Sequence, residues 1–357
     1  MLNERIRRAR ILRAMSLQQV ADAIGDISKQ ALSKFETGQD TPSSTRIIQL
    51  AKILGLKPEY FFRPDTVVLG QVDFRKKTRL TNKQQEAVLE QTREHLERYV
   101  ALEATFDADP LPCLFKDDQK ISVSTQQDAE SAAKELRSRW EIGFDAIQSL
   151  TELLEDRGIK VVEIDAPEAF DGMCARLEDT NEAVIIINQN KPGERQRFTV
   201  AHELGHLIMD VPDSVDDKAE ENLCHRFAGA FLMPERGVRA DFGDKRSHVH
   251  FRELKLAKEN YGISMQAALR RLLDLEIISA SVYQGMMIQF SKEGYRKNEP
   301  WALASEKPTR FESLVYRGLA EGLFTPSKAA EFLQTHVAMV EQSLEEAFKA
   351  DDASSDL

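Results

Sequence analysis

The stretch TVAHELGHLI, residues 199–208, decides most of what this sequence can be. Two histidines, His202 and His206, stand four residues apart in it, and at about 3.6 residues per turn both imidazoles face one side of a helix. They can therefore bind one metal ion together, as the histidines of a His-Glu-x-x-His pattern do. Glu203 can take a proton from a water molecule on that ion as a general base. The pattern predicts a zinc-dependent hydrolytic site with Glu203 as its catalytic residue.

A buried strand and a turn precede the predicted metal helix. The run AVIIIN at residues 183–188 is rich in β-branched side chains and is bounded by polar residues, which indicates a buried strand. The turn KPGE at residues 191–194 then leads into the helix. A strand beside a metal helix can hold a peptide in extended form, and this strand is the candidate for that role.

A second helix is predicted after the metal helix, over residues 218–233, and it ends at Pro234. Glu221 on this helix would complete a His2Glu set and leave the fourth position to water. His225 follows one turn later, and it can be an alternative ligand, an oxyanion stabiliser or a histidine packed beside the ligands; we expect the last. The implied cofactor is one Zn²⁺ per chain, with another divalent ion such as Mn²⁺ as the alternative.

The first sixty residues contain several short helices separated by caps and turns. Ser16 and Gly25 bound one predicted helix, and Ser28 and Gly38 bound the next, over residues 29–37. Two short helices joined by a tight turn have the geometry of a helix-turn-helix, whose second helix enters the major groove of DNA. The predicted DNA-binding side chains are Lys29, Gln30, Ser33 and Lys34. The alternative is that these residues form only the solvated face of a helical bundle.

Charge is distributed unevenly along the chain. The 357 residues carry a formal net charge of −11, yet the first 63 contain eleven Lys or Arg against six Asp or Glu. A basic module on an acidic body fits a DNA-binding domain joined to a second function. Without a membrane-spanning apolar run or the apolar stretch of a signal peptide, we expect a cytoplasmic protein with no membrane partner. Three cysteines without a CxxC spacing argue against a disulfide framework.

The whole chain reads as mainly α with a small β-sheet, an α+β fold. We expect an all-α helix-turn-helix domain at 1–66, a helical connector at 67–110, a metallopeptidase domain at 111–290, and a C-terminal helical region with a disordered tail at 291–357. The connector contains the basic residues 75–77 and continues as an amphipathic helix towards Phe106. We expect this helix to pack within the chain, with a dimer contact as the alternative.

The N-terminal part resembles a known family. SLQQVA at 16–21, ISKQALSKFETG at 27–38 and TP at 41–42 closely resemble the Xre/Cro-type repressor domain, over about residues 2–63. Leu17 stands where that family commonly has Gln near the DNA backbone, which puts one phosphate contact in doubt. The resemblance implies binding to a double-stranded DNA operator, and a homodimer on a palindromic site.

The metal helix and the helix after it resemble a second family. RQRFTVAHELGH at 195–206 and RFAGAFLMP at 226–234 are similar to the ImmA/IrrE family of zinc metallopeptidases, whose fold is zincin-like. In that family the third ligand is the Glu three residues before a motif like Ala-Asn-x-Phe-Ala, which here implies Glu221. Cys224 and His225 replace the commoner Ala-Asn pair.

Together the two resemblances imply a DNA-binding transcriptional regulator with a zinc-dependent endopeptidase domain. Such a protein would cleave a repressor partner, a toxin-system partner or itself, and so control phage, mobile-element or stress genes, with an activity that is latent until triggered. The alternative is a non-proteolytic repressor or antitoxin whose peptidase-like domain senses metal or binds a partner.

Overall fold

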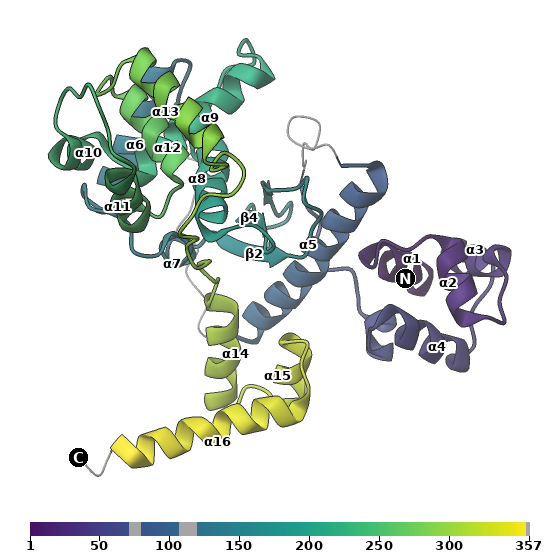
Figure 1. Ribbon diagram of the computed structural model, residues 1–357. Coiled ribbons are helices and arrows are strands. Elements are labelled where there is room, and N and C mark those ends of the chain that lie inside the picture. Colours follow the sequence, from purple (N-terminus) through teal and green to yellow (C-terminus); the bar gives the residue numbers. More distant parts are fainter. Residues whose placement is uncertain (71–79, 107–119, 355–357) are drawn as a thin grey trace. The chain divides into compact units, whose positions relative to one another are not determined.

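The computed structural model describes residues 1–70, 80–106 and 120–354 (Figure 1). Over these residues the chain is mainly helical with two small sheets, which confirms the predicted fold class. It divides into two compact units: residues 1–69, 80–112 and 309–357 form the first, and residues 70–79 and 113–308 form the second. Among the described helices, none is long and apolar enough to cross a membrane.

The first unit begins with the predicted helices: α1 (Leu2–Leu12), α2 (Leu17–Ile24), α3 (Lys29–Thr37), α4 (Ser44–Leu54) and the 3-10 helix η1 (Pro58–Phe62). The Ser16 hydroxyl accepts a hydrogen bond from the Gln19 amide at 3.1 Å and caps α2. Ser28 caps α3 in the same way. Gly38 ends α3 at a φ of +73°, a conformation that glycine adopts without strain. The predicted pair of short helices and the turn between them are confirmed.

The predicted connector helix is α5 (Asn82–Glu103), and it packs on α1 within the first unit. Arg5 on α1 is fully buried, and its Nη1 donates to Glu97 Oε2 at 2.7 Å. Arg8 pairs with Glu90 and lies 2.9 Å from Glu97. Because removing one partner of a buried ion pair strands the other charge, these pairs fix α5 to α1. The basic residues 75–77 lie outside the described residues.

The C-terminal helices also belong to the first unit. They are α14 (Arg310–Ala320), α15 (Pro326–Phe332) and α16 (Val337–Ser354), and α5 is followed by the short η2 (Ala104–Phe106). Tyr99 on α5 lies in one core with Phe311, Val315 and Phe332. A long amphipathic helix that the sequence presents as a linker is therefore the surface on which the chain's last helices pack.

The second unit contains a three-stranded sheet of β2 (Lys160–Ile164), β4 (Ala183–Asn188) and β3 (Gly172–Arg176), in that order. β2 runs parallel to β4, whereas β3 runs antiparallel to it. A two-stranded sheet pairs β1 (Ile121–Ser122) with β5 (Met209–Asp210). The helices of this unit are α6 (Gln126–Arg139), α7 (Leu150–Asp156), α8 (Gly193–Ile208), α9 (Asp217–Leu232), α10 (Glu235–Phe242), α11 (Phe251–Tyr261), α12 (Met265–Asp274) and α13 (Ala280–Lys292).

The position of β4 corrects one expectation from the sequence. Every residue of β4 is buried, as predicted, but both of its hydrogen-bonding edges are taken by β2 and β3. It therefore has no edge to offer an extended substrate. The neighbouring β3, which the sequence did not reveal, packs against α8. A Cβ at Gly172 of β3 would lie 2.5 Å from Thr199 Cγ2 of α8, so only glycine permits this approach.

The structure divides the chain later than the sequence suggests, at residue 308 rather than 290. The Glu299 carboxylate accepts hydrogen bonds from the Met265 and Gln266 amides, at 2.8 and 3.0 Å, and so caps the start of α12. The Glu306 carboxylate accepts bonds from the Leu150 and Thr151 amides, at 2.7 and 3.0 Å, at the start of α7. Residues 291–308 therefore stay with the second unit, because they accept hydrogen bonds from first-turn amides of α7 and α12 that the N-caps Ser149 and Ser264 leave unpaired.

Candidate metal centre

The site is built where α8 packs against α9. The Asp216 carboxylate accepts a bond from the Ala219 amide at 2.8 Å and starts α9. On α8, a Cβ at Gly205 would lie 3.1 Å from Phe227 Cδ1 of α9, so glycine allows the two helices to approach closely. Side chains on the facing sides of α8 and α9 can therefore contact each other directly.

Glu221 of α9 meets both histidines of α8. Its Oε2 lies 3.1 Å from His202 Nε2, and its Oε1 lies 3.4 Å from His206 Nε2. The two imidazole rings are 5.1 Å apart, centroid to centroid, and nearly perpendicular. Two ligands of one tetrahedral zinc ion are about 3.3 Å apart, because each lies about 2.0–2.2 Å from the metal. The separations between Glu221 and the histidines match that spacing, so these residues fit a zinc ion.

The surroundings of His206 favour a positive charge. Burial by itself would lower the pKa of His206, but hydrogen bonds with Cys224, Glu220 and Glu221 raise that pKa to about 12. Glu220 Oε1 lies 3.2 Å from His206 Nδ1, the ring nitrogen that does not face Glu221. A carboxylate at this position orients an imidazole and makes it a better ligand. The carboxylates around His206 therefore stabilise a positive charge there, either a proton on the imidazole ring or a bound metal ion.

His225 lies closer to this centre than the sequence suggests. Its ring centroid is 4.5 Å from that of His202, and it stacks on Phe198 with centroids 6.0 Å apart. One ligand atom each of His202, Glu221 and His225 lie within 4.8 Å of one another. Over the part of the chain that the structure describes, this is the one such group of three, and His206 is not a member of it. His206 instead joins the centre through Glu220 and Glu221.

Glu203 lies beside His202, whereas two other histidines of this unit, His248 and His250, are outside the metal group. Glu203 is buried, on the same turn of α8 as His202. His250 Nδ1 accepts a bond from the Arg252 amide at 3.1 Å and caps α11. His248 is exposed and is likewise outside the three-residue group. Imidazole and carboxylate donors are the set that zinc takes in catalytic sites.

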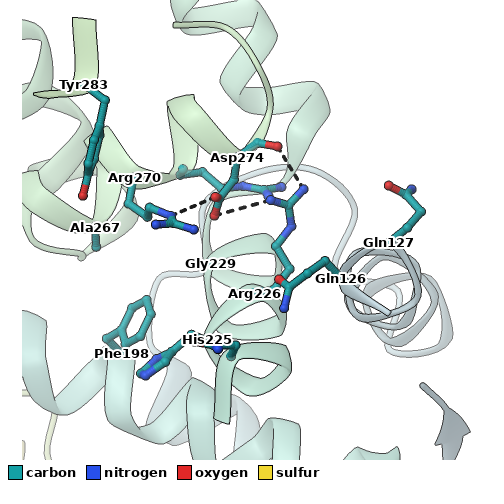
Figure 2. Close-up of a pocket in the computed structure, with 12 residues that line it drawn as sticks. Gln126, Gln127, Phe198, His225, Arg226, Gly229, Ala267, Arg270, Asp274 and Tyr283 are labelled. Atoms are coloured by element: carbon teal, nitrogen blue, oxygen red, sulfur yellow. Dashed lines mark hydrogen bonds and ion pairs between the residues drawn. The ribbon is translucent and has the colours of Figure 1, made fainter. Parts of the chain in front are cut away.

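A cavity of about 760 Å³ opens beside His225 (Figure 2). Phe198 and His225 line one side of it, and the pairs that Asp274 forms with Arg226 and Arg270 line another. Sequence reasoning missed this cavity, because its walls come from α6, α8, α9, α12 and α13 together. Arg270 and Arg271 of α12 were a weak sign of this cavity in the sequence, but their spacing does not predict what the two side chains face.

The predicted DNA-binding residues lie on α3. Lys29, Gln30 and Lys34 are exposed and Ser33 is half-buried, whereas Leu32 points into the core. The exposed face of α3 is therefore polar and carries two lysines. That is what the recognition helix of a helix-turn-helix requires.

Two family models match parts of this chain. Residues 6–61 match a helix-turn-helix model, and residues 154–273 match a peptidase model described as the IrrE N-terminal-like domain. The first match spans α2 and α3, and the second spans α8 and α9 with the residues of the metal centre.

Curated relatives match over a short stretch. The radiation response metalloprotease IrrE of Deinococcus radiodurans is 41% identical over 69 residues, which cover 16% of this chain and 21% of the relative. The protein of the same name from Deinococcus deserti is 41% identical over 68 residues, covering 16% of this chain and 24% of the relative. The chain thus spans less than a quarter of the length of either relative.

Solved structures match weakly. A Mycobacterium tuberculosis transcriptional regulator is 20% identical with a TM-score of 0.30, over 49% of this chain and 52% of the other. Bacillus thuringiensis PlcR, in complex with a peptide and DNA, is 9% identical with a TM-score of 0.18, over 99% of this chain and 95% of the other. At these TM-scores neither likeness carries an argument about function.

Proposed function

Since the chain joins a helix-turn-helix domain to an IrrE N-terminal-like peptidase domain, we propose that it is a DNA-binding regulator that cleaves protein with a zinc-dependent site. The observation that carries this proposal is the meeting of Glu221 with His202 and His206, at 3.1 and 3.4 Å, inside the segment that matches the peptidase model.

His202, His206 and Glu221 are the proposed protein ligands of the metal. Zinc bound there would lower the pKa of a water molecule towards about 7 and polarise the carbonyl of the peptide bond. Glu220 holds His206 through its Nδ1, so that Nε2 faces the centre. Apolar packing of α8 against α9 excludes bulk water from the far side of the site.

Glu203 is the proposed general base. It follows His202 directly on α8 and is buried, with 2% of its surface exposed. A carboxylate in this position takes the proton of the attacking water and passes it to the leaving amine. That role requires Glu203 to act on the reacting atoms and not to bind the metal.

The first unit supports the proposal that the chain binds double-stranded DNA. Exposed Lys29, Gln30 and Lys34 lie on one face of α3, whose buried face is fixed to the core by Leu32 and Phe35. Glutamine pairs well with adenine, and lysine reaches guanine or phosphate. A dimer on a palindromic operator follows from the usual geometry of such domains.

Joining both functions in one chain has a physical advantage. A peptidase tethered to an operator meets a repressor bound at the same operator at a high effective concentration. The proposed substrates are therefore few: a partner repressor, a toxin-system partner or this chain itself. Control of phage, mobile-element or stress genes, with a site that stays latent until a trigger arrives, is the corresponding biological role.

Metal content tests the centre first. The purified full chain is analysed for bound zinc and manganese beside a His202→Ala, His206→Ala double variant. We expect about one zinc ion per chain in the wild type and a loss in the variant. A wild type that binds no divalent ion would refute the peptidase proposal and favour a regulator without proteolysis.

The general base is tested by Glu203→Gln, with Glu235→Gln, an exposed carboxylate on α10 of the same unit, as the matched control. Both variants should keep the metal, and only Glu203→Gln should lose cleavage. Cleavage is followed by mass spectrometry on the chain itself and on the protein encoded by the neighbouring gene. Equal behaviour of the wild type and Glu203→Gln against both substrates would contradict the proposal.

The DNA-binding face is tested on the chain's own promoter. Gln30→Ala and Lys34→Ala should weaken binding, each by about 1–3 kcal/mol if the side chain reads a base. Lys34→Ala should also reduce the salt dependence if it contacts a phosphate. Lys52→Ala, an exposed lysine on α4, is the control. Promoter affinity equal to that of the control would overturn the assignment of α3.

A further inference from the structure

Glu221 and His225 repeat on α9 the spacing of His202 and His206 on α8. Each pair is four residues apart on a helix, so each presents two donor groups on one face. The two helices are packed together, and the two pairs face each other. Two such pairs supply four protein donors to one centre, whereas a hydrolytic zinc site uses three and keeps one position open.

The measured geometry places His225 among these donors. The ligand atoms of His202, Glu221 and His225 lie within 4.8 Å of one another. Donors on one zinc ion are about 3.3 Å apart, so these three atoms must move closer together to share one ion. His206, at 3.4 Å from Glu221, is already at that spacing.

We propose that His225 is a fourth protein ligand, which closes the metal site at rest. This inference rests on the proposed zinc peptidase and adds the device that keeps it latent. With three imidazoles and one carboxylate bound, the ion has the filled tetrahedral sphere of a structural site. No coordination position then remains for water or for the carbonyl of a substrate.

His225 differs from the other three ligands in being exposed, while His202 is buried. Its ring stacks on Phe198, and both side chains line the cavity beside the centre (Figure 2). A ligand at the mouth of a site can leave without opening the helix pair behind it. The cavity of about 760 Å³ offers space for the displaced ring or for the molecule that displaces it.

The competing account is that His225 only packs on Phe198 or donates a hydrogen bond to substrate. Both roles leave the resting metal with two imidazoles from His202 and His206. The number of imidazoles on the bound ion therefore separates the accounts without reference to activity.

The test uses the full chain loaded with Zn²⁺, its His225→Asn variant and His248→Asn as a matched control. His248 is also an exposed histidine of the second unit, and it lies outside the metal group. X-ray absorption should find three imidazoles on zinc in the wild type and the control, and two in His225→Asn. Competition with a chelator should show zinc binding at least about ten-fold weaker in His225→Asn, since even supporting residues contribute that much.

Peptidase activity gives a second readout, because it should rise in His225→Asn while the affinity for zinc falls. Opening a coordination position should make His225→Asn cleave faster than the wild type under saturating zinc, although it binds zinc less tightly. If His225 only supported the site, its replacement would lower both the zinc affinity and the peptidase activity. Two imidazoles in the wild type, or unchanged zinc affinity in His225→Asn, would overturn the closing role and leave the peptidase proposal intact. Absence of zinc from the wild type would instead refute both proposals.

Discussion

Replacing Glu306 should destabilise the second unit far more than its place in an irregular segment suggests. Its carboxylate pairs with Arg197, whose side chain is 5% exposed, near the start of the metal helix α8. It also accepts the amide hydrogens of Leu150 and Thr151 at the start of α7. Glu306→Ala therefore removes the partner of a buried charge and the acceptor for two amides in the first turn of α7, although the N-cap Ser149 stays in place.

The magnitude follows from these contacts. Leaving a buried charge without its partner costs about 3–5 kcal/mol, and the 22% exposure of Glu306 favours the lower end, about 3 kcal/mol. Loss of the acceptor for the Leu150 and Thr151 amides of α7 adds about 1 kcal/mol. The free energy of unfolding should fall by about 4 kcal/mol. With a urea dependence of about 2 kcal/mol per molar, the unfolding midpoint should fall by about 2 M.

Tryptophan fluorescence measures this change selectively. The chain contains two tryptophans, Trp140 and Trp301, and both belong to the second unit. Trp140 is buried, and its ring packs edge-on against Phe231 with centroids 6.0 Å apart, so its emission reports unfolding of this unit. Urea titration of the full chain thus follows the second unit even if the first unfolds separately.

The neighbouring residue supplies the control. Lys307 pairs with Glu163 at 2.9 Å, but 59% of the lysine side chain is exposed. Such a surface pair contributes about 0–1 kcal/mol, so Lys307→Ala should leave the midpoint almost unchanged. If Glu306→Ala and Lys307→Ala shift the midpoint equally, the reasoning from burial and capping is wrong. Residues 300–308 would then contribute little to the stability of the second unit.

Three further predictions concern other parts of the chain. Burial raises the pKa of Glu130, but the hydrogen bonds and positive charges of Arg271 and Arg226 together bring it below its usual range, so its stabilising effect is present above about pH 4.5 and is lost as the pH falls. Glu130→Gln should therefore lower the urea midpoint at pH 7 and make it depend less on pH between about 5 and 3. Ser28→Ala removes the cap of α3 and should destabilise the first unit by about 1 kcal/mol in circular dichroism melts, whereas no change would show that the cap is dispensable. Gly205→Ala forces a Cβ against Phe227 at 3.1 Å and should weaken zinc affinity about ten-fold, as measured by chelator competition; unchanged affinity would mean that α8 and α9 can separate without moving the ligands.

Local patterns were sufficient for the parts of the chain whose structure depends on near neighbours. The caps Ser16 and Ser28 and the glycines after α2 and α3 defined the helix-turn-helix. Residues four apart on α8 identified two facing histidines, since the helix repeat alone sets that geometry. The apolar run of β4 correctly indicated a buried strand.

What the sequence by itself determined was thus the identity of its helices and the residue types at the metal centre. The tertiary structure decided which residues meet. It placed β4 in the middle of its sheet, brought His225 to within 4.8 Å of the ligand atoms of His202 and Glu221, and kept Glu306 with the second unit. The physical reason is that helix periodicity and capping act over a few residues, whereas strand order, contacts between helices and the pairing of buried charges depend on segments that can lie more than a hundred residues apart.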